Sequence, residues 1–161
     1  MVNEEAVLEL RRRTRNCQAL TRANLLLANL WSSTHLYIGL PNTALATLAG
    51  VSALSDLGVP KTLTALLSIT VAVLTALVTF LNPTAKYSSY HSAAQRYQAV
   101  ADKYLILALK SENILEQNLL DELAILNGEY NKVMESSPVV PSWAYKKGKQ
   151  DVRFSVESTI K

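Results

Sequence analysis

The chain has 161 residues, enough for about one domain. Its single cysteine, Cys17, excludes an intrachain disulfide and leaves no cysteine framework for a metal site. With only five glycines and five prolines, and no strand-turn-strand rhythm, the chain is predicted to be mostly helical. The net charge of +3 does not choose between nucleic acid, an anionic membrane face and no charged partner, and 49% hydrophobic residues do not decide between a soluble and a membrane protein.

The first segment, up to Trp31, is predicted to be a helix with one pairing face. Apolar and small side chains recur there at spacings of three and four, at Val7, Leu10, Thr14, Cys17, Thr21, Asn24, Ala28 and Trp31. The same segment carries a basic cluster, made of Arg11, Arg12, Arg13 and Arg15. We expect this cluster to mark membrane orientation and to bind anionic lipid headgroups or a partner, with nucleotide binding as an alternative.

Two long stretches, 23–55 and 62–85, contain no Asp, Glu, Lys or Arg. A bilayer core about 30 Å thick needs about 20 apolar residues in a helix. A soluble helix should show a charged face, and the rest of this short chain is too small to wrap two helices buried on all sides. We therefore predict two membrane spans, at about residues 34–55 and 62–82, instead of a buried pair of core helices.

The link between the spans, "SALSDLGVPK", contains Gly58 and Pro60 and favours a turn. So short a link predicts an antiparallel helical hairpin with both termini on one side. Basic residues are concentrated outside the hairpin, whereas the link carries only Lys61. The positive-inside rule then places both termini in the cytoplasm and the link on the opposite side of the membrane. The expected fold class is all-α: a two-transmembrane helical hairpin with long N- and C-terminal cytoplasmic helices.

Each predicted span has one face of small and polar side chains. On the first span this face comprises His35, Gly39, Asn42, Ala46, Ala49, Ala53 and Asp56, and on the second it comprises Ser68, Ala72, Thr75, Thr79 and Asn82. Small residues, including the pair Ala46 and Gly50, let membrane helices pack closely. The alternative is that these faces line a water path after oligomerisation, with Leu74 and Val78 on lipid-facing sides. His35 and Asp56 are expected near opposite interfaces, where their placement is structural.

The pair Asn82-Pro83 is predicted to close the second span and to begin a new helix, because Asn is a good N-cap and Pro a good first residue. A second pairing face follows, at Tyr90, Ala94, Tyr97, Ala101, Tyr104 and Ala108. We expect "LKSEN" at 109–113 to break this helix, a further amphipathic helix to run from Leu115 to Val133, and "SSPVVPSW" to end regular helix. The predicted organisation is one domain, 1–149, followed by a polar tail, 150–161.

Several of these features together resemble the SLATT family of two-transmembrane effector domains, which are associated with bacterial nucleotide signalling and anti-phage defence. The matching features are the basic N-terminal helix, the hairpin, the closing "PVVPSWAYKKGK" at 138–149, and five residues of "FLNPTAKYSSYHSAAQRYQAVADKY" at 80–104: Pro83, Lys86, His91, Ala94 and Tyr97. The resemblance covers about residues 5–149. It implies a membrane effector that disrupts the host's inner membrane when a separate nucleotide-sensing or nucleotide-synthesising partner is triggered.

Two functions therefore remain open. The first is a pore-forming or membrane-permeabilising effector that acts as a homo-oligomer in membrane lipid. The second is a membrane-anchored adaptor whose cytoplasmic helices recruit a signalling partner. We expect no enzyme, cofactor, metal or nucleic-acid partner, because the chain has no phosphate loop, no HExxH motif and no paired carboxylates at a site.

Overall fold

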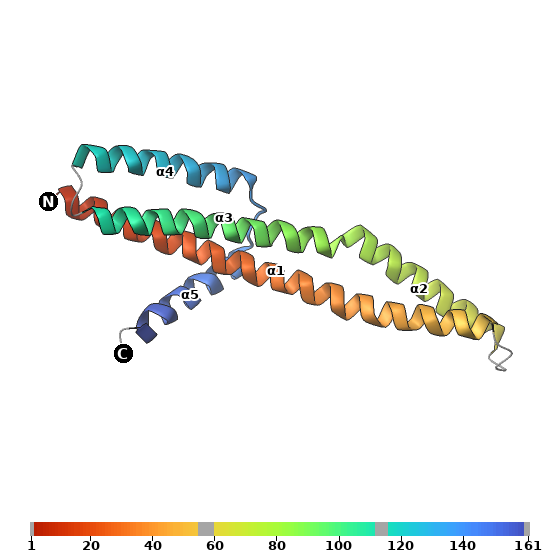
Figure 1. The fold of residues 1–161 in the computed structure, drawn as a ribbon. Helices are drawn as coiled ribbons and strands as arrows, with labels where there is room; N and C mark the ends of the chain where they lie inside the picture. Colours follow the sequence, from red (N-terminus) through yellow and green to blue (C-terminus); the bar gives the residue numbers. More distant parts are fainter. Residues whose placement is uncertain (1, 55–59, 112–115, 160–161) are drawn as a thin grey trace. The chain divides into compact units, whose positions relative to one another are not determined.

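The computed structural model describes residues 2–54, 60–111 and 116–159 (Figure 1). Within these ranges the chain forms α-helices and no strand, so the all-α prediction is confirmed. The helices are α1 (Val2–Leu54), α2 (Lys61–Leu81), α3 (Pro83–Lys110), α4 (Glu116–Ser136) and α5 (Ser142–Thr159). The predicted break after α3 is confirmed, because α3 ends at Lys110. The prediction that "SSPVVPSW" ends regular helix is wrong: residues 137–141 interrupt the helix, but α5 begins again at Ser142.

The chain divides into two compact units. The bundle unit combines Met1–Ala28 with Ser88–Lys161, so it is built from both ends of the chain. The hairpin unit is the middle of the chain, Asn29–Tyr87. The single domain expected for residues 1–149 is thus organised as two units, each with its own packing.

The core of the bundle unit joins α1, α3 and α4. Its buried side chains are Leu10, Cys17, Val100, Ala101, Tyr104, Leu107, Leu119 and Leu126. Leu10, Cys17, Ala101 and Tyr104 belong to the predicted pairing faces, whereas Val100 and Leu107 lie outside them. The helices before and after the hairpin therefore pack on one another within one chain. Burial of so many apolar side chains, each contributing on the order of 1.5–3 kcal/mol, makes this core the main source of the unit's stability.

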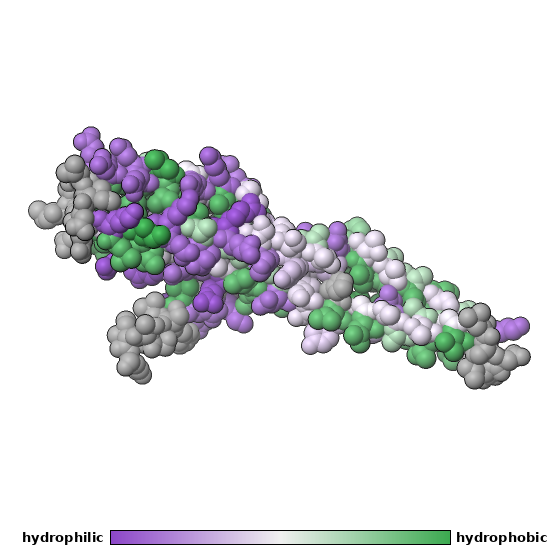
Figure 2. All heavy atoms as spheres, in the orientation of Figure 1, coloured by the Kyte–Doolittle hydropathy of each residue, from purple (hydrophilic) through white to green (hydrophobic). Residues whose placement is uncertain are grey.

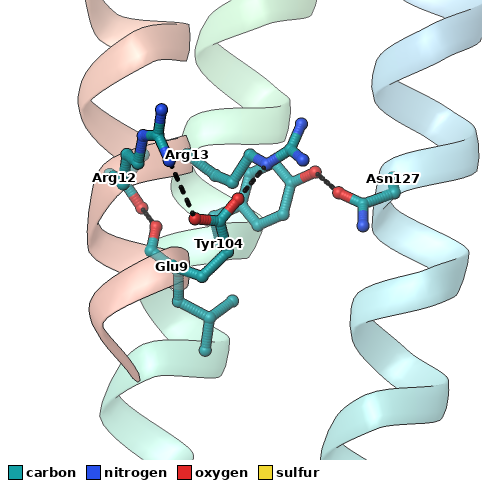
Figure 3. A network of polar contacts seen from close by, with 7 residues as sticks. Glu9, Arg12, Arg13, Tyr104 and Asn127 are labelled. Carbon is teal, nitrogen blue, oxygen red and sulfur yellow. Dashed lines mark hydrogen bonds and ion pairs between the residues drawn. The ribbon is translucent and has the colours of Figure 1, made fainter. Parts of the chain in front are cut away.

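A network of polar contacts lies along one edge of this core (Figure 3). The Tyr104 hydroxyl on α3 donates a hydrogen bond of 2.7 Å to Oδ1 of Asn127 on α4. On α1, Glu9 accepts a hydrogen bond of 2.8 Å from Nε of Arg13 and lies 3.7 Å from Arg12. Burial raises the pKa of Tyr104 to about 12, so this hydroxyl remains a donor at neutral pH. The hydrogen bond to Asn127 therefore satisfies the hydroxyl group of Tyr104, the largest of the fully buried side chains.

The polar tail expected at 150–161 is helical as far as Thr159, where α5 ends. One face of α5 is buried through residues four apart: Ala144, Gly148 and Val152. A Cβ atom on Gly148 would clash with the Ala19 carbonyl oxygen and would lie 2.9 Å from the Ala23 nitrogen. Only a glycine lets the two backbones approach so closely. Because charged residues surround this narrow face in the sequence, the spacing of apolar residues does not indicate it.

The prediction that Asn82 begins a new helix is confirmed. Asn82 ends α2 in the left-handed conformation, with φ 42° and ψ 59°, and its N–H donates to the Val78 carbonyl at 3.1 Å. Its side-chain Oδ1 accepts a hydrogen bond of 3.3 Å from the Ala85 N–H in the first turn of α3. Asn tolerates this conformation better than most residues, so one side chain caps two consecutive helices.

We expect native Cys17 to resist alkylation. Its side chain is fully buried in the bundle core, and burial raises its pKa from 9.0 to about 11, which lowers the reactive thiolate fraction at pH 8 by about 100-fold. Iodoacetamide labelling followed by mass spectrometry should show little modification of the folded protein and complete modification in guanidinium. Labelling of the folded protein at the rate of a free cysteine would contradict the burial. An unlabelled Cys17 therefore says nothing about membrane sidedness.

Candidate functional site

In the hairpin unit, the second half of α1 and α2 lie side by side (Figure 1). Asn42 on α1 donates a hydrogen bond of 3.0 Å from Nδ2 to Oγ1 of Thr75 on α2, which joins two of the predicted candidates. Leu74 and Val78 are partly covered, whereas Thr75 and Thr79 are exposed. Val78 lines the same hollow as Thr75 and Thr79, so the expectation that Val78 lies on a separate, lipid-facing side is wrong. The expectation for Leu74 stays a prediction.

The outer surface of the hairpin unit is unusually apolar. None of the residues of α2 is buried, and Ile69 and Phe80 are 63% and 88% exposed. Figure 2 shows pale and hydrophobic side chains over α2 and the second half of α1, whereas hydrophilic ones gather over α3 and α4. Among the described residues one helical stretch, within Lys61–Lys110, is long and apolar enough to cross a bilayer, with mean hydropathy 2.3 over its best window. The second half of α1 does not reach that measure.

A groove of about 630 Å³ opens between α1 and α2 on this apolar unit. We call it the threonine groove, because hydroxyls and one amide dominate its polar lining. Its lining includes Gly39, Asn42, Thr43 and Thr47 from α1 and Thr75 and Thr79 from α2. The structure thus brings together three predicted candidates, Asn42, Thr75 and Thr79. Sequence analysis missed Thr43 and Thr47, although their spacing of four beside Gly39 was a visible signal.

Three hydroxyls of the threonine groove donate to carbonyl groups of their own helix. Thr43 donates to the Gly39 carbonyl at 2.9 Å, Thr47 to the Thr43 carbonyl at 3.0 Å, and Thr79 to the Thr75 carbonyl at 2.9 Å. Such pairing lets a hydroxyl lie in an apolar medium without an unsatisfied proton. The oxygen atoms keep the capacity to accept a further hydrogen bond. The groove is therefore neutral and can take up water or a polar side chain, but it holds no charge.

The Asn42 amide is only half satisfied. Its Oδ1 is buried and has no hydrogen-bond partner among the described residues. A buried carbonyl oxygen without a donor is unfavourable by about 1–3 kcal/mol. A hydrogen-bond donor at this position, such as a water molecule, would relieve this penalty.

The other predicted candidates do not line the groove. Ala46, Gly50 and Ser68 are exposed, and a Cβ atom on Gly50 would meet nothing within 4 Å. The pair Ala46 and Gly50 is therefore not a packing contact within this chain. Asn82 serves as the cap between α2 and α3. The side chain of His35 and the whole of Asp56 lie outside the described residues.

The predicted basic cluster separates into two pairs. Arg12 and Arg13 form ion pairs with Glu9, and the hydrogen bond to Glu9 raises the pKa of Arg13. Arg11 and Arg15 instead line a pocket in the bundle unit together with Arg153 of α5. Arg153 was missed because its segment was taken as a tail.

Within the described ranges, no group of three His, Cys, Asp or Glu side chains could hold a metal ion. A comparison with family models, curated proteins and solved structures finds no match to this chain.

Proposed function

We propose that the chain is a membrane effector whose hairpin crosses a bacterial inner membrane twice, with both termini in the cytoplasm. Copies of the chain associate in the bilayer and permeabilise it, in a defence response of the kind that the resemblance to the SLATT family implies. A separate nucleotide-sensing or nucleotide-synthesising protein supplies the trigger.

The observation that carries this proposal is the threonine groove on an exposed apolar hairpin. Leu66, Ile69 and Phe80 are each more than 60% exposed, and an apolar surface of this kind needs cover by lipid or by other copies. A purely anchoring hairpin needs no polar groove. Hydroxyl oxygens and the Asn42 amide supply hydrogen-bond acceptors that can solvate water or ions along a path between subunits.

The adaptor function is the second candidate, and one observation favours it. Ile106 on α3 and Ile125 on α4 are 51% and 66% exposed in the bundle unit, and both line a hollow of about 260 Å³. Exposed apolar side chains beside a hollow suit the docking of a partner helix. In this alternative the hairpin only anchors the chain.

The double substitution Thr75→Leu and Thr79→Leu should remove most of the ion leak from liposomes that contain the purified protein. The two leucine side chains would fill the threonine groove without supplying hydrogen-bond acceptors. Membrane abundance, measured by carbonate extraction, should stay unchanged. Thr70→Leu is the matched control: Thr70 is exposed on α2 and bonds its own helix at the Leu66 carbonyl, but it lies outside the groove.

Cross-linking in membranes separates the outcomes. Loss of leak with the oligomer retained supports conduction through the groove, whereas joint loss of oligomer and leak assigns the groove to packing between copies. An unchanged oligomer and an unchanged leak in the double variant Thr75→Leu and Thr79→Leu would reject the permeabilising function and favour the adaptor.

A further inference from the structure

A pocket of about 480 Å³ lies in the bundle unit, where α1, α3 and α5 meet. We call it the arginine pocket. Its lining includes Arg11, Arg15 and Gln18 of α1, Leu105 of α3, and Val152 and Arg153 of α5. Among the residues that the structure describes, no carboxylate lines it. Three arginines from two helices therefore border one hollow whose described walls contain no acidic residue.

These arginines differ from the other two of the basic cluster. Arg12 and Arg13 both form ion pairs with Glu9. None of the ion pairs between described side chains includes Arg11, Arg15 or Arg153. Like charges that share a hollow repel one another, and an anion between them removes that repulsion. The three arginines of the pocket thus carry positive charge that no ion pair with a described side chain balances.

Buried packing holds both sides of the arginine pocket in place. Arg11 and Arg15 lie one turn apart on α1, on either side of the buried Thr14. On α5, Gly148 contacts the α1 backbone, and Val152 is buried one turn later. Arg153 follows Val152 directly, so the contact between the helices presents this arginine beside Arg11 and Arg15.

We propose that the arginine pocket binds a phosphate-bearing ligand. Guanidinium groups bind phosphate with two parallel hydrogen bonds, which makes arginine the preferred residue for this group. Leu105 and Val152 provide an apolar wall for the remainder of the ligand, and the volume lies in the range of small-molecule sites. The phosphate belongs either to a soluble molecule or to the headgroup of an anionic lipid. This inference does not depend on membrane permeabilisation.

The test uses the full chain in nanodiscs of neutral phosphatidylcholine, with inorganic pyrophosphate as the probe. We expect pyrophosphate to raise the unfolding temperature, and more strongly at low salt. Arg15→Gln and Arg153→Gln should each weaken binding about tenfold or more. Arg12→Gln is the control, since Arg12 is exposed and pairs with Glu9 outside the pocket. Unchanged helix content by circular dichroism shows that the variants fold.

A second arm replaces phosphatidylcholine with phosphatidylglycerol and omits pyrophosphate. A rise in unfolding temperature that Arg153→Gln abolishes, with no response to pyrophosphate in neutral discs, assigns the pocket to a lipid headgroup. A response to pyrophosphate in neutral discs assigns it to a soluble ligand. If neither anion acts, or if Arg12→Gln weakens binding as much as Arg15→Gln, the proposed site is wrong.

Discussion

Gly148→Ala should lower the free energy of unfolding of the bundle unit by about 2 kcal/mol, because an added methyl group in a close-packed contact forces backbone shifts. The methyl group would clash with the Ala19 carbonyl and lie 3.3 Å from Ala23 Cβ. Neither obstacle can move easily, since the first is helix backbone and the second is attached directly to it. The result should be displacement of α5 from α1, and with it loss of the arginine pocket.

Gly128→Ala is the matched control for this variant. Gly128 is an exposed residue of α4, and a Cβ atom there would meet nothing within 4 Å. Alanine should therefore stabilise the helix by about 0.5–1 kcal/mol. Urea denaturation followed by circular dichroism measures both variants, and hydrogen exchange of residues 142–153 reports on α5 itself. Equal stability of the two variants would mean that α5 does not pack on α1 as described.

Tyr104→Ala should be the most damaging core substitution, with a loss of about 3–5 kcal/mol, because removal of a large buried aromatic side chain leaves a cavity. Tyr104 is fully buried and contributes to the cluster that joins α1, α3 and α4. Ile125→Ala, at a position 66% exposed on α4, should change stability by about 0.5 kcal/mol or less. Thermal unfolding compares the two, and a similar loss in both would contradict the assigned core.

Tyr104→Phe removes only the hydroxyl group of this side chain and so measures its contribution to stability. It should cost about 1–2 kcal/mol, since Asn127 Oδ1 loses its donor at 2.7 Å. The pKa of Tyr104 rises from 10.0 to about 12 in the folded chain, so between these values the unfolded state binds fewer protons than the folded state. Stability is therefore lost as pH rises from 10 to 12. Tyr104→Phe should flatten this part of the pH profile, and an unchanged slope would assign the loss to other groups.

The helical framework was predictable because its signals are local. Leu10, Cys17 and Tyr104 recur at helical spacing, and each is buried as the pairing faces predict. The caps at Asn82 also follow from short-range chemistry, since one Asn before Pro83 suits both a left-handed end and a new first turn. Such features depend on a few neighbouring residues, which the sequence displays directly.

The candidate sites were only partly predictable, because they depend on which sides of two helices meet. Spacing alone placed Ser68 on the same stripe as Thr75, yet of these two only Thr75 lines the groove, and Val78, which was expected on a lipid-facing side, lines it as well. Helix periodicity gives the direction of a side chain around its own axis but not the position of the partner helix. For the same reason Arg153 was invisible as a neighbour of Arg11: the contact at Gly148 that brings them together spans more than a hundred residues of sequence.

The bundle unit is made from both ends of the chain, and this has a consequence for biosynthesis. The first 28 residues leave the ribosome before the hairpin, whereas their packing partners on α3 and α4 come after it. At about 5–20 residues per second, translation from Ala28 to Leu126 takes roughly 5–20 seconds. Until α3 is synthesised, Leu10 and Cys17 have no core partner from α3 or α4, and the hairpin unit is complete before either helix. The order of synthesis therefore gives the hairpin time to reach its final environment before the bundle closes, and a ribosome that stalls after α3 would release a chain with an open core.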